Sequence, residues 1–217
     1  CLNVFSFGGM FLGAGLLYFL DKLCHLSPAH VFAVYGLISI VVTTYALKIM
    51  PLLLLRCINW LITHTLYKVT LVGAENIPRK GGGLLVCNHV TYTDPSILLS
   101  SIDRPIRFLV YKPIYDKWYV KPVLNLLKCI PVASEQDPKS VVRALDEVRE
   151  AILAGELVCI FAEGAITRHG NMLPFKKGLE RIMRGVNAPI IPLYIDQIWG
   201  SIFSFKEGTP LWKWPKE

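Results

Sequence analysis

Residues 84–95 read LLVCNHVTYTDP, and this stretch decides how the chain folds. The apolar letters at its start are typical of a buried strand, and His89 follows close behind them. Asp94 and Pro95 then open another apolar segment, which predicts the start of a helix. The His-x4-Asp spacing therefore puts a base and a carboxylate at one turn between a strand and a helix.

The pair of His89 and Asp94 has two interpretations. In the catalytic one, the carboxylate holds the imidazole in the tautomer that takes a proton from an alcohol. In the structural one, Asp94 is an ordinary N-cap residue, and Pro95 stands at the first helical position. The spacing alone does not decide between them, because a motif needs its structural context.

A second apolar run, with the letters LVCIFA, ends in Glu163 and Gly164. Arg168 follows it, and Lys176 and Lys177 come shortly afterwards. An acid, a glycine turn and several cations after a buried strand suit an anionic, phosphate-bearing substrate. The alternative is a solvated basic loop without a ligand, since runs of charge are commonly just exposed faces.

Taken together, these segments resemble the glycerophospholipid acyltransferases of the PlsC type. The letters NHVTYTD from Asn88 onward look like the family's first motif, and FAEG followed by Arg168 looks like its third. The letters APIIPL at residues 188–193 look like its fourth motif, an apolar strand that contains proline. The resemblance covers roughly residues 67–195, and the paired first and third motifs are specific.

The chain departs from the family pattern in two places. Ala162 stands where the third motif usually has proline, which should alter the turn slightly. The second motif usually carries a glycine and a closing arginine, whereas residues 127–132 read LKCIPV here. The substrate-contacting arginine of that motif is therefore unassigned in this chain.

The resemblance implies a fold and a reaction. The fold is a glycerolipid-acyltransferase-like α/β sheet flanked by helices. In the reaction, His89 deprotonates the hydroxyl of a lysophospholipid, which attacks an acyl thioester, while Asp94 orients His89. The acyl donor is acyl-carrier protein or coenzyme A in its acylated form, and the mechanism implies neither a further cofactor nor a metal.

The resemblance also assigns substrate contacts. Glu163 and Gly164 would shape the acceptor pocket. The acceptor phosphate would be bound by cations at the ends of the strands, namely Arg168 helped by Lys112, Lys176 or Lys177.

A narrower resemblance is carried by the letters EGAITR at residues 163–168 and QIWGSIF at residues 197–203. They look like the acyltransferase part of bacterial 2-acylglycerophosphoethanolamine acyltransferases. In some bacteria that part is fused behind a lysophospholipid transporter and ahead of an acyl-acyl-carrier-protein synthetase. This narrower resemblance implies that the acceptor is 2-acylglycerophosphoethanolamine, with 1-acylglycerol-3-phosphate as the alternative.

Two other classes of function compete with acyl transfer. A lipid hydrolase would use the same His and Asp with a serine or cysteine nucleophile, but the chain has no Gly-x-Ser-x-Gly elbow. Ser96 and Ser134 are available without a nucleophile context. A non-catalytic transporter module would need an upstream chain, because two membrane spans cannot make a transport path.

The start of the chain is charge-poor. Residues 1–20 carry no charge, and after Asp21 and Lys22 no charged side chain occurs before Lys48. A bilayer span needs about 20 apolar residues, so two spans fit, near residues 2–20 and 31–50. A buried core hairpin is the less favoured alternative. Because the first residue is Cys and no basic leader precedes the apolar run, we expect an excerpt of a longer polypeptide.

These features predict three parts: a transmembrane hairpin at 1–50, an interfacial or linker helix at 51–66, and an acyltransferase domain at 67–217. Lys22 is alone in the loop between the spans, whereas Lys48, Arg56 and Lys68 follow the second span. The positive-inside rule then places the domain in the cytoplasm. The narrower resemblance implies that the membrane is a bacterial inner membrane.

The net charge of +7 favours membrane lipids, phosphorylated substrates or an acidic carrier protein as partners. Nucleic acid is not expected, because no nucleic-acid-binding motif is present.

The six cysteines are scattered without a Cys-x-x-Cys pair, so we interpret them as small reduced hydrophobic residues. The histidines near the membrane segment are too dispersed for a metal site.

Periodicity predicts strands alternating with helices, which indicates an α/β sheet domain. We expect strands at 69–72, 84–87, 106–110, 157–162 and 189–195, and helices at 118–127, 138–153 and 175–184. Residues 51–67 suit either an interfacial amphipathic helix or a buried linker helix. The tryptophans near the C-terminus, at 199, 212 and 214, suit either headgroup anchoring or packing on the domain edge.

Overall fold

The computed structural model describes residues 11–16, 18–19, 22, 27–133, 137–206 and 208. The chain forms two compact units, Cys1–Pro51 and Leu52–Glu217. In the first unit, helix α2 (Pro28–Ile49) is long and apolar enough to cross a membrane, and few of its side chains are buried. It matches the second predicted span. The first predicted span lies largely outside the described residues.

The second unit is built on a five-stranded sheet in which every pair of neighbouring strands is parallel. The strand order is β3-β2-β4-β1-β5. The strands are β1 (Gly83–Cys87), β2 (Ile106–Tyr111), β3 (Ile130–Val132), β4 (Leu157–Phe161) and β5 (Ile190–Leu193). The helices of this unit are α3 (Pro51–Leu66), α4 (Asp94–Ser101), α5 (Lys112–Tyr115), α6 (Lys121–Leu126), α7 (Pro138–Leu153) and α8 (Gly178–Met183).

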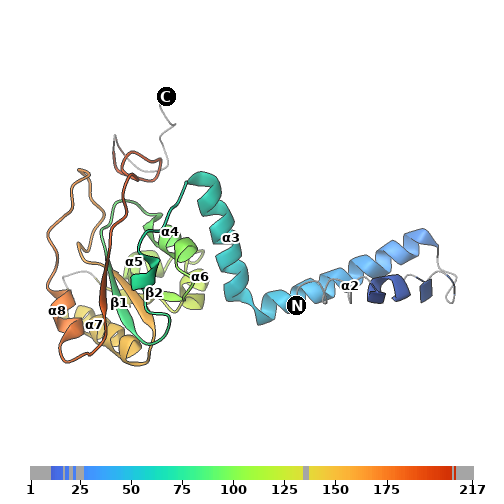
Figure 1. Ribbon diagram of the computed structural model, residues 1–217, viewed down its shortest axis with the longest axis horizontal. Coiled ribbons are helices and arrows are strands. Elements are labelled where there is room, and N and C mark those ends of the chain that lie inside the picture. Colours follow the sequence, from blue (N-terminus) through green and yellow to red (C-terminus); the bar gives the residue numbers. More distant parts are fainter. Residues whose placement is uncertain are drawn as a thin grey trace. The chain divides into compact units, whose positions relative to one another are not determined.

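The central strands are buried on both faces, as their continuous apolar sequences predict. In β1, Leu85 packs with α4 and with residues of α6, whereas Leu84 and Val86 pack with α7 and α8. β4 alternates in the same way. Figure 1 shows the resulting layers, with α4, α5 and α6 on one side of the sheet and α7 and α8 on the other. The predicted α/β sheet flanked by helices is therefore confirmed.

Several predicted elements differ in the structure. Residues 69–72 form no strand, because β5 occupies the sheet edge beside β1 and Val69 instead packs its side chain against a small apolar cluster. β3 and α5 were not predicted, because each is only a few residues long. The predicted helices 118–127 and 175–184 are shortened to α6 and α8. Helix α7 has the predicted bounds.

Helix α3 is amphipathic with its polar side toward the domain. Arg56 Nη2 donates to the Ile102 carbonyl at 2.7 Å, and Asn59 Nδ2 donates to the Ser96 carbonyl at 2.8 Å, so these side chains fasten α3 to α4. The outward side is apolar and exposed over Leu53, Leu54, Ile58, Trp60, Leu61, Ile62 and Leu66. The outward side of α3 is therefore not covered by the described residues, and the interfacial helix stays a prediction.

Candidate active site

The carboxyl ends of three neighbouring strands create the site. Cys87 at the end of β1 is in register with Phe161 of β4 and Leu193 of β5. The residues that follow these strands consequently meet at one edge of the sheet, where open α/β sheets bind their ligands. His89 and Glu163, which are far apart in sequence, are brought together in this way.

His89 and Asp94 form a hydrogen-bonded pair. The distance from His89 Nδ1 to Asp94 Oδ2 is 2.8 Å, and the Asp94 side chain is fully buried, whereas that of His89 is 18% exposed. An ionised carboxylate only accepts hydrogen bonds, so Nδ1 donates and carries the proton. Nε2 then bears a lone pair that can take a proton from a substrate.

The carboxylate of Asp94 is held by the turn that precedes it. Oδ2 accepts from the backbone N–H of Val90 at 2.6 Å and of Thr91 at 3.0 Å. Oδ1 accepts from the Thr91 hydroxyl at 2.6 Å. These bonds run backward along the chain and do not cap the free N–H groups of α4, whose N-cap residue is Thr93. The N-cap interpretation of Asp94 is therefore wrong.

The backbone of His89 is fixed from the loop after β4. Glu163 Oε1 accepts from the His89 N–H at 2.8 Å, and the His89 carbonyl accepts from the Thr167 N–H at 3.0 Å. The second Glu163 oxygen accepts from the Leu173 N–H at 2.6 Å. Glu163 is only 3% exposed, so this buried carboxylate joins the turn that carries His89 to the loop after β4.

Two neighbours of the dyad were missed by sequence reasoning. Phe161 stacks on the imidazole of His89, with ring centroids 4.0 Å apart and an interplanar angle of 15°. The Asn88 side chain makes two hydrogen bonds with the backbone of Ile195. Its Oδ1 accepts from the Ile195 N–H at 2.8 Å, and its Nδ2 donates to the Ile195 carbonyl at 3.0 Å. The position of Phe161 at the end of a predicted strand indicated that it lies near the site. Its stacking on His89 could not be predicted, because it depends on the register of β1 and β4.

The expected cations take different positions around the edge. Arg168 is exposed, and its guanidinium carbon lies 5.3 Å from the centroid of the Phe205 ring. Lys112, directly after β2, pairs with Asp116 at 2.7 Å. The Lys176 side chain passes directly over Gly164, whose backbone has φ +68. Lys177 is exposed and directly precedes α8.

The cysteine at the end of β1 is not a nucleophile. Burial, with a smaller contribution from Asp94, raises the pKa of the Cys87 thiol to about 12. The thiolate is the reactive form of cysteine, so this side chain is inert near neutral pH. In the described part of the chain, no hydrogen bond joins Ser96 to His89. These observations concern Cys87 and Ser96, whereas Ser134, the other serine available to a hydrolase, lies outside the described residues.

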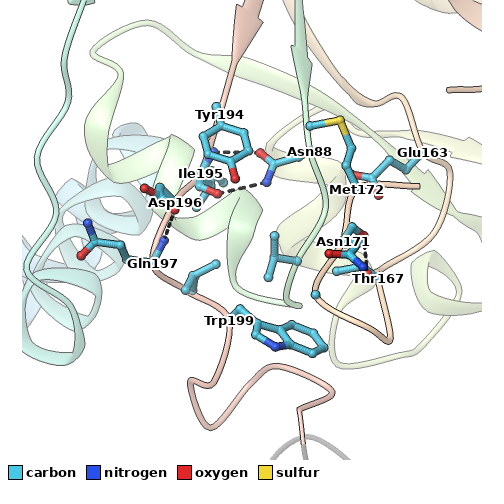
Figure 2. A pocket seen from close by; sticks show the side chains of 13 residues that line it. Asn88, Glu163, Thr167, Asn171, Met172, Tyr194, Ile195, Asp196, Gln197 and Trp199 are labelled. Carbon is cyan, nitrogen blue, oxygen red and sulfur yellow. Dashed lines mark hydrogen bonds between the residues drawn. The ribbon is translucent and has the colours of Figure 1, made fainter. Parts of the chain in front are cut away.

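A small pocket of about 120 Å³ is lined by Asn88 and Val90, the two neighbours of His89 in the chain, but neither His89 nor Asp94 lines it (Figure 2). Its walls come from the loop 167–172 and the segment 194–199, together with Asn88, Val90 and Glu163. Trp199 closes one side and packs on Gly170, where an added Cβ would lie 2.7 Å from the indole ring. Of the two interpretations of Trp199, these contacts support packing on the domain edge. The other two tail tryptophans lie outside the described residues.

Comparison with known proteins identifies the family. Residues 68–196 match the family described as Acyltransferase, which is more than half of the chain. The chain therefore belongs to this acyltransferase family.

Curated relatives share the same region. A probable 1-acyl-sn-glycerol-3-phosphate acyltransferase of Mycoplasma pneumoniae is 28% identical over 144 residues, which is 64% of this chain and 53% of the relative. The 1-acyl-sn-glycerol-3-phosphate acyltransferase of Borreliella burgdorferi is 27% identical, over 58% of this chain and 50% of the relative. The chain thus spans about half the length of these relatives.

A solved structure supports the fold. The crystal structure of the 1-acyl-sn-glycerophosphate acyltransferase PlsC from Thermotoga maritima matches with a TM-score of 0.51 and 22% identity. The match covers 83% of this chain and 71% of that one. At this identity the likeness concerns the fold, and the chemistry has to be argued from the site itself.

Proposed function

We propose that this protein is a membrane-bound O-acyltransferase that moves a fatty acyl group from an acyl thioester to the hydroxyl of a lysophospholipid. The observation that carries the proposal is the dyad at the carboxyl edge of the sheet. Its buried carboxylate sets the tautomer of His89, and its imidazole is partly exposed. Membership of the acyltransferase family agrees with this chemistry.

The geometry supports a direct transfer without an acyl-enzyme. Nε2 of His89 takes the proton of the acceptor hydroxyl while that oxygen forms a bond to the thioester carbonyl carbon. The carbon–sulfur bond then breaks, and the departing thiolate receives the proton from His89. Asp94 stabilises the imidazolium between these two steps, and Glu163 and Phe161 hold the imidazole in place.

The acceptor phosphate needs a cation near the dyad. Arg168 is suited to this role because it follows Thr167, which is bonded to the His89 carbonyl. Its guanidinium can bind a phosphate with two parallel hydrogen bonds. Gly164 leaves room for the Lys176 side chain to cross the same loop. Lys112 and Lys177 are weaker candidates, because Lys112 is paired with Asp116 and Lys177 precedes α8.

Two acceptors fit the site equally. The finer proposal is 2-acylglycerophosphoethanolamine with acyl-carrier protein as donor, in the setting of a transporter fusion, and it rests on the EGAITR and QIWGSIF letters. The second is 1-acylglycerol-3-phosphate, the acceptor after which the similar proteins of Mycoplasma pneumoniae and Borreliella burgdorferi are named. The apolar helix α2 and the outward side of α3 support a membrane location. The charge pattern supports an orientation with the domain in the cytoplasm, and the narrower resemblance is the basis for proposing a bacterial inner membrane.

The test uses the full chain in lipid nanodiscs with both lysolipids and both acyl donors. His89→Ala should reduce transfer by about 10²-fold or more, because general-base catalysis typically contributes that much. His169→Ala is the matched control, since His169 is an exposed histidine of the neighbouring loop. Release of free fatty acid in place of acylated lipid would identify a hydrolase and contradict the proposal.

Asp94→Asn separates the orienting role from the folding role. An amide nitrogen would face at least one of the donors that now point at the carboxylate, so a loss of about 1–3 kcal/mol of stability is expected. If Asp94 orients the imidazole, transfer should also fall by orders of magnitude in protein that remains folded, as judged by its thermal melt. Normal turnover in folded Asp94→Asn protein would reject the dyad.

A further inference from the structure

The short segment between α5 and α6 presents aromatic side chains to the outside. Trp118 is 83% exposed, more than any other aromatic side chain among the described residues. Tyr119 is 58% exposed, and the two rings meet edge to face with centroids 5.7 Å apart. Large aromatic rings in such positions mark contact sites, because water is a poor environment for them.

The same segment is basic. Residues 111–121 contain Lys112, Lys117 and Lys121 against the single acid Asp116. That acid is already paired with Lys112 at 2.7 Å and lies 3.8 Å from Lys121. The Lys117 ammonium stands 6.0 Å from the centroid of the Tyr119 ring. The surface therefore combines exposed rings with a net positive charge.

The place of the segment in the fold adds a second argument. β2 ends at the carboxyl edge that also carries the dyad, and α5 begins directly after it. Residues of α4, α5 and α6 pack on the same face of the sheet, and α3 is fastened to α4 by Arg56 and Asn59 (Figure 1). Helix α3 is thus attached to the helical layer that precedes and follows the aromatic segment, and its own side away from α4 is apolar and exposed.

We propose that residues 117–121 dock into the headgroup layer of an anionic lipid bilayer. Trp118 and Tyr119 would lie at the boundary between headgroups and acyl chains, where amphipathic rings are enriched. Lys117 and Lys121 would bind lipid phosphates. The exposed apolar side of α3 favours lipid over an acidic protein as the occupant. This inference rests on the proposed membrane location but not on the acyl-transfer chemistry.

The test measures contact between Trp118 and lipid directly. The full chain is reconstituted in nanodiscs that contain phospholipids with brominated acyl chains, which quench tryptophan fluorescence at short range. Trp118→Phe should remove part of the quenched emission. Trp199→Phe, which changes a ring packed on Gly170, should remove emission that is not quenched.

The charges are tested in the same system. Lys117→Glu and Lys121→Glu should each weaken docking by about fivefold or more on discs with anionic lipid, and less on zwitterionic discs. The inactive His89→Ala variant should be quenched like the unaltered protein, so a failure of the acyl-transfer proposal is visible separately.

Two outcomes would overturn the proposal. In the first, the quenched emission is the same with and without Trp118. In the second, the Trp118 and lysine variants leave quenching unchanged but raise the Michaelis constant for acyl-carrier protein, which would assign the surface to an acidic protein.

Discussion

At the scale of single residues, Asp94 organises the site. One fully buried carboxylate accepts hydrogen bonds from His89, from two backbone N–H groups and from the Thr91 hydroxyl. A buried charge is tolerated only when it is satisfied in this way. The orientation of the imidazole therefore depends on residues that do not touch the substrate themselves.

Thr91 is the residue through which this dependence can be measured. Its side chain is fully buried, and its hydroxyl donates to Asp94 Oδ1 at 2.6 Å while also contacting the Thr93 hydroxyl at 2.8 Å. A hydrogen bond to a charged group is worth about 1.5–3 kcal/mol. Thr91→Val, which keeps the shape and removes the hydroxyl, should therefore lower kcat about tenfold or more.

The control for this prediction is Thr91→Ser, which keeps the hydroxyl and should restore most of the rate. The Michaelis constant for the lysolipid should be unchanged in both variants, because the Thr91 side chain is fully buried. If Thr91→Val keeps the rate while Thr91→Ser loses it, packing of the methyl group matters and the hydrogen bond to Asp94 does not.

At the scale of elements, the amino end of β1 lies very close to the end of α7. A Cβ added to Gly82 would lie 1.8 Å from the carbonyl oxygen of Ile152, which is a backbone atom and cannot rotate away. Gly82→Ala should accordingly destabilise the domain by about 3 kcal/mol, the upper range for overpacking. Thermal or denaturant unfolding measures this change.

The matched variant is Gly178→Ala at the start of α8. A Cβ there would meet only the Leu145 side chain, at 3.4 Å, and alanine is a better helix residue than glycine. Its stability should change by less than about 1 kcal/mol. Similar losses at both positions would show that the close approach at Gly82 is not the cause.

The ion pairs of Arg107 join β2 to α7 and to the start of β4. Its guanidinium contacts Glu147 at 2.9 Å and Glu156 at 2.8 Å. The hydrogen bond from Arg107 lowers the pKa of Glu156 below its ordinary value of 4.5. A lowered pKa in the folded state means that the pair stabilises the protein above about pH 4.5, and that this contribution is lost as pH falls through the folded value.

Glu156→Gln tests this pH dependence. The Glu156 side chain is 32% exposed, so the loss of stability at neutral pH should stay below about 1 kcal/mol. The difference in unfolding free energy between the unaltered protein and Glu156→Gln should shrink as pH drops below 4.5. A difference that is constant from pH 7 to pH 3 would contradict the pairing with Arg107.

At the scale of the whole molecule, charge bears on the choice of acyl donor. The chain has a net charge of +7, and acyl-carrier proteins are acidic, so their encounter should be steered electrostatically. The Debye length falls from about 10 Å at 0.1 M salt to about 3 Å at 1 M, which screens such steering. We expect acyl-carrier protein to be the preferred donor at low salt.

Coenzyme A carries phosphates as well, so salt sensitivity alone is not informative. The measurement is kcat/KM with matched acyl chains on the two donors over a range of ionic strength. The preference for the carrier protein should shrink as salt rises. A preference for acyl-coenzyme A at every salt concentration would reject the carrier protein, and with it the narrower assignment.

Local patterns in the sequence were sufficient for much of this architecture. The apolar runs of β1 and β4, the helical period of α7 and the His-x4-Asp spacing are all written within short stretches. Such patterns predict an element wherever burial of its own side chains decides its conformation. The dyad was predictable for the same reason, because His89 and Asp94 belong to one turn.

Tertiary structure decided what depends on partners distant in the chain. The stacking of Phe161 on His89, the bond from Glu163 to the His89 backbone and the exchange between Asn88 and Ile195 all require the register of three parallel strands. The outward apolar side of α3 became apparent only once its polar side was seen fastened to α4. The sequence thus determined which residues form the dyad. Pairing between strands that are remote in sequence decided how His89 is held, because the contacts of Phe161 and Glu163 with His89 form only once the sheet has formed.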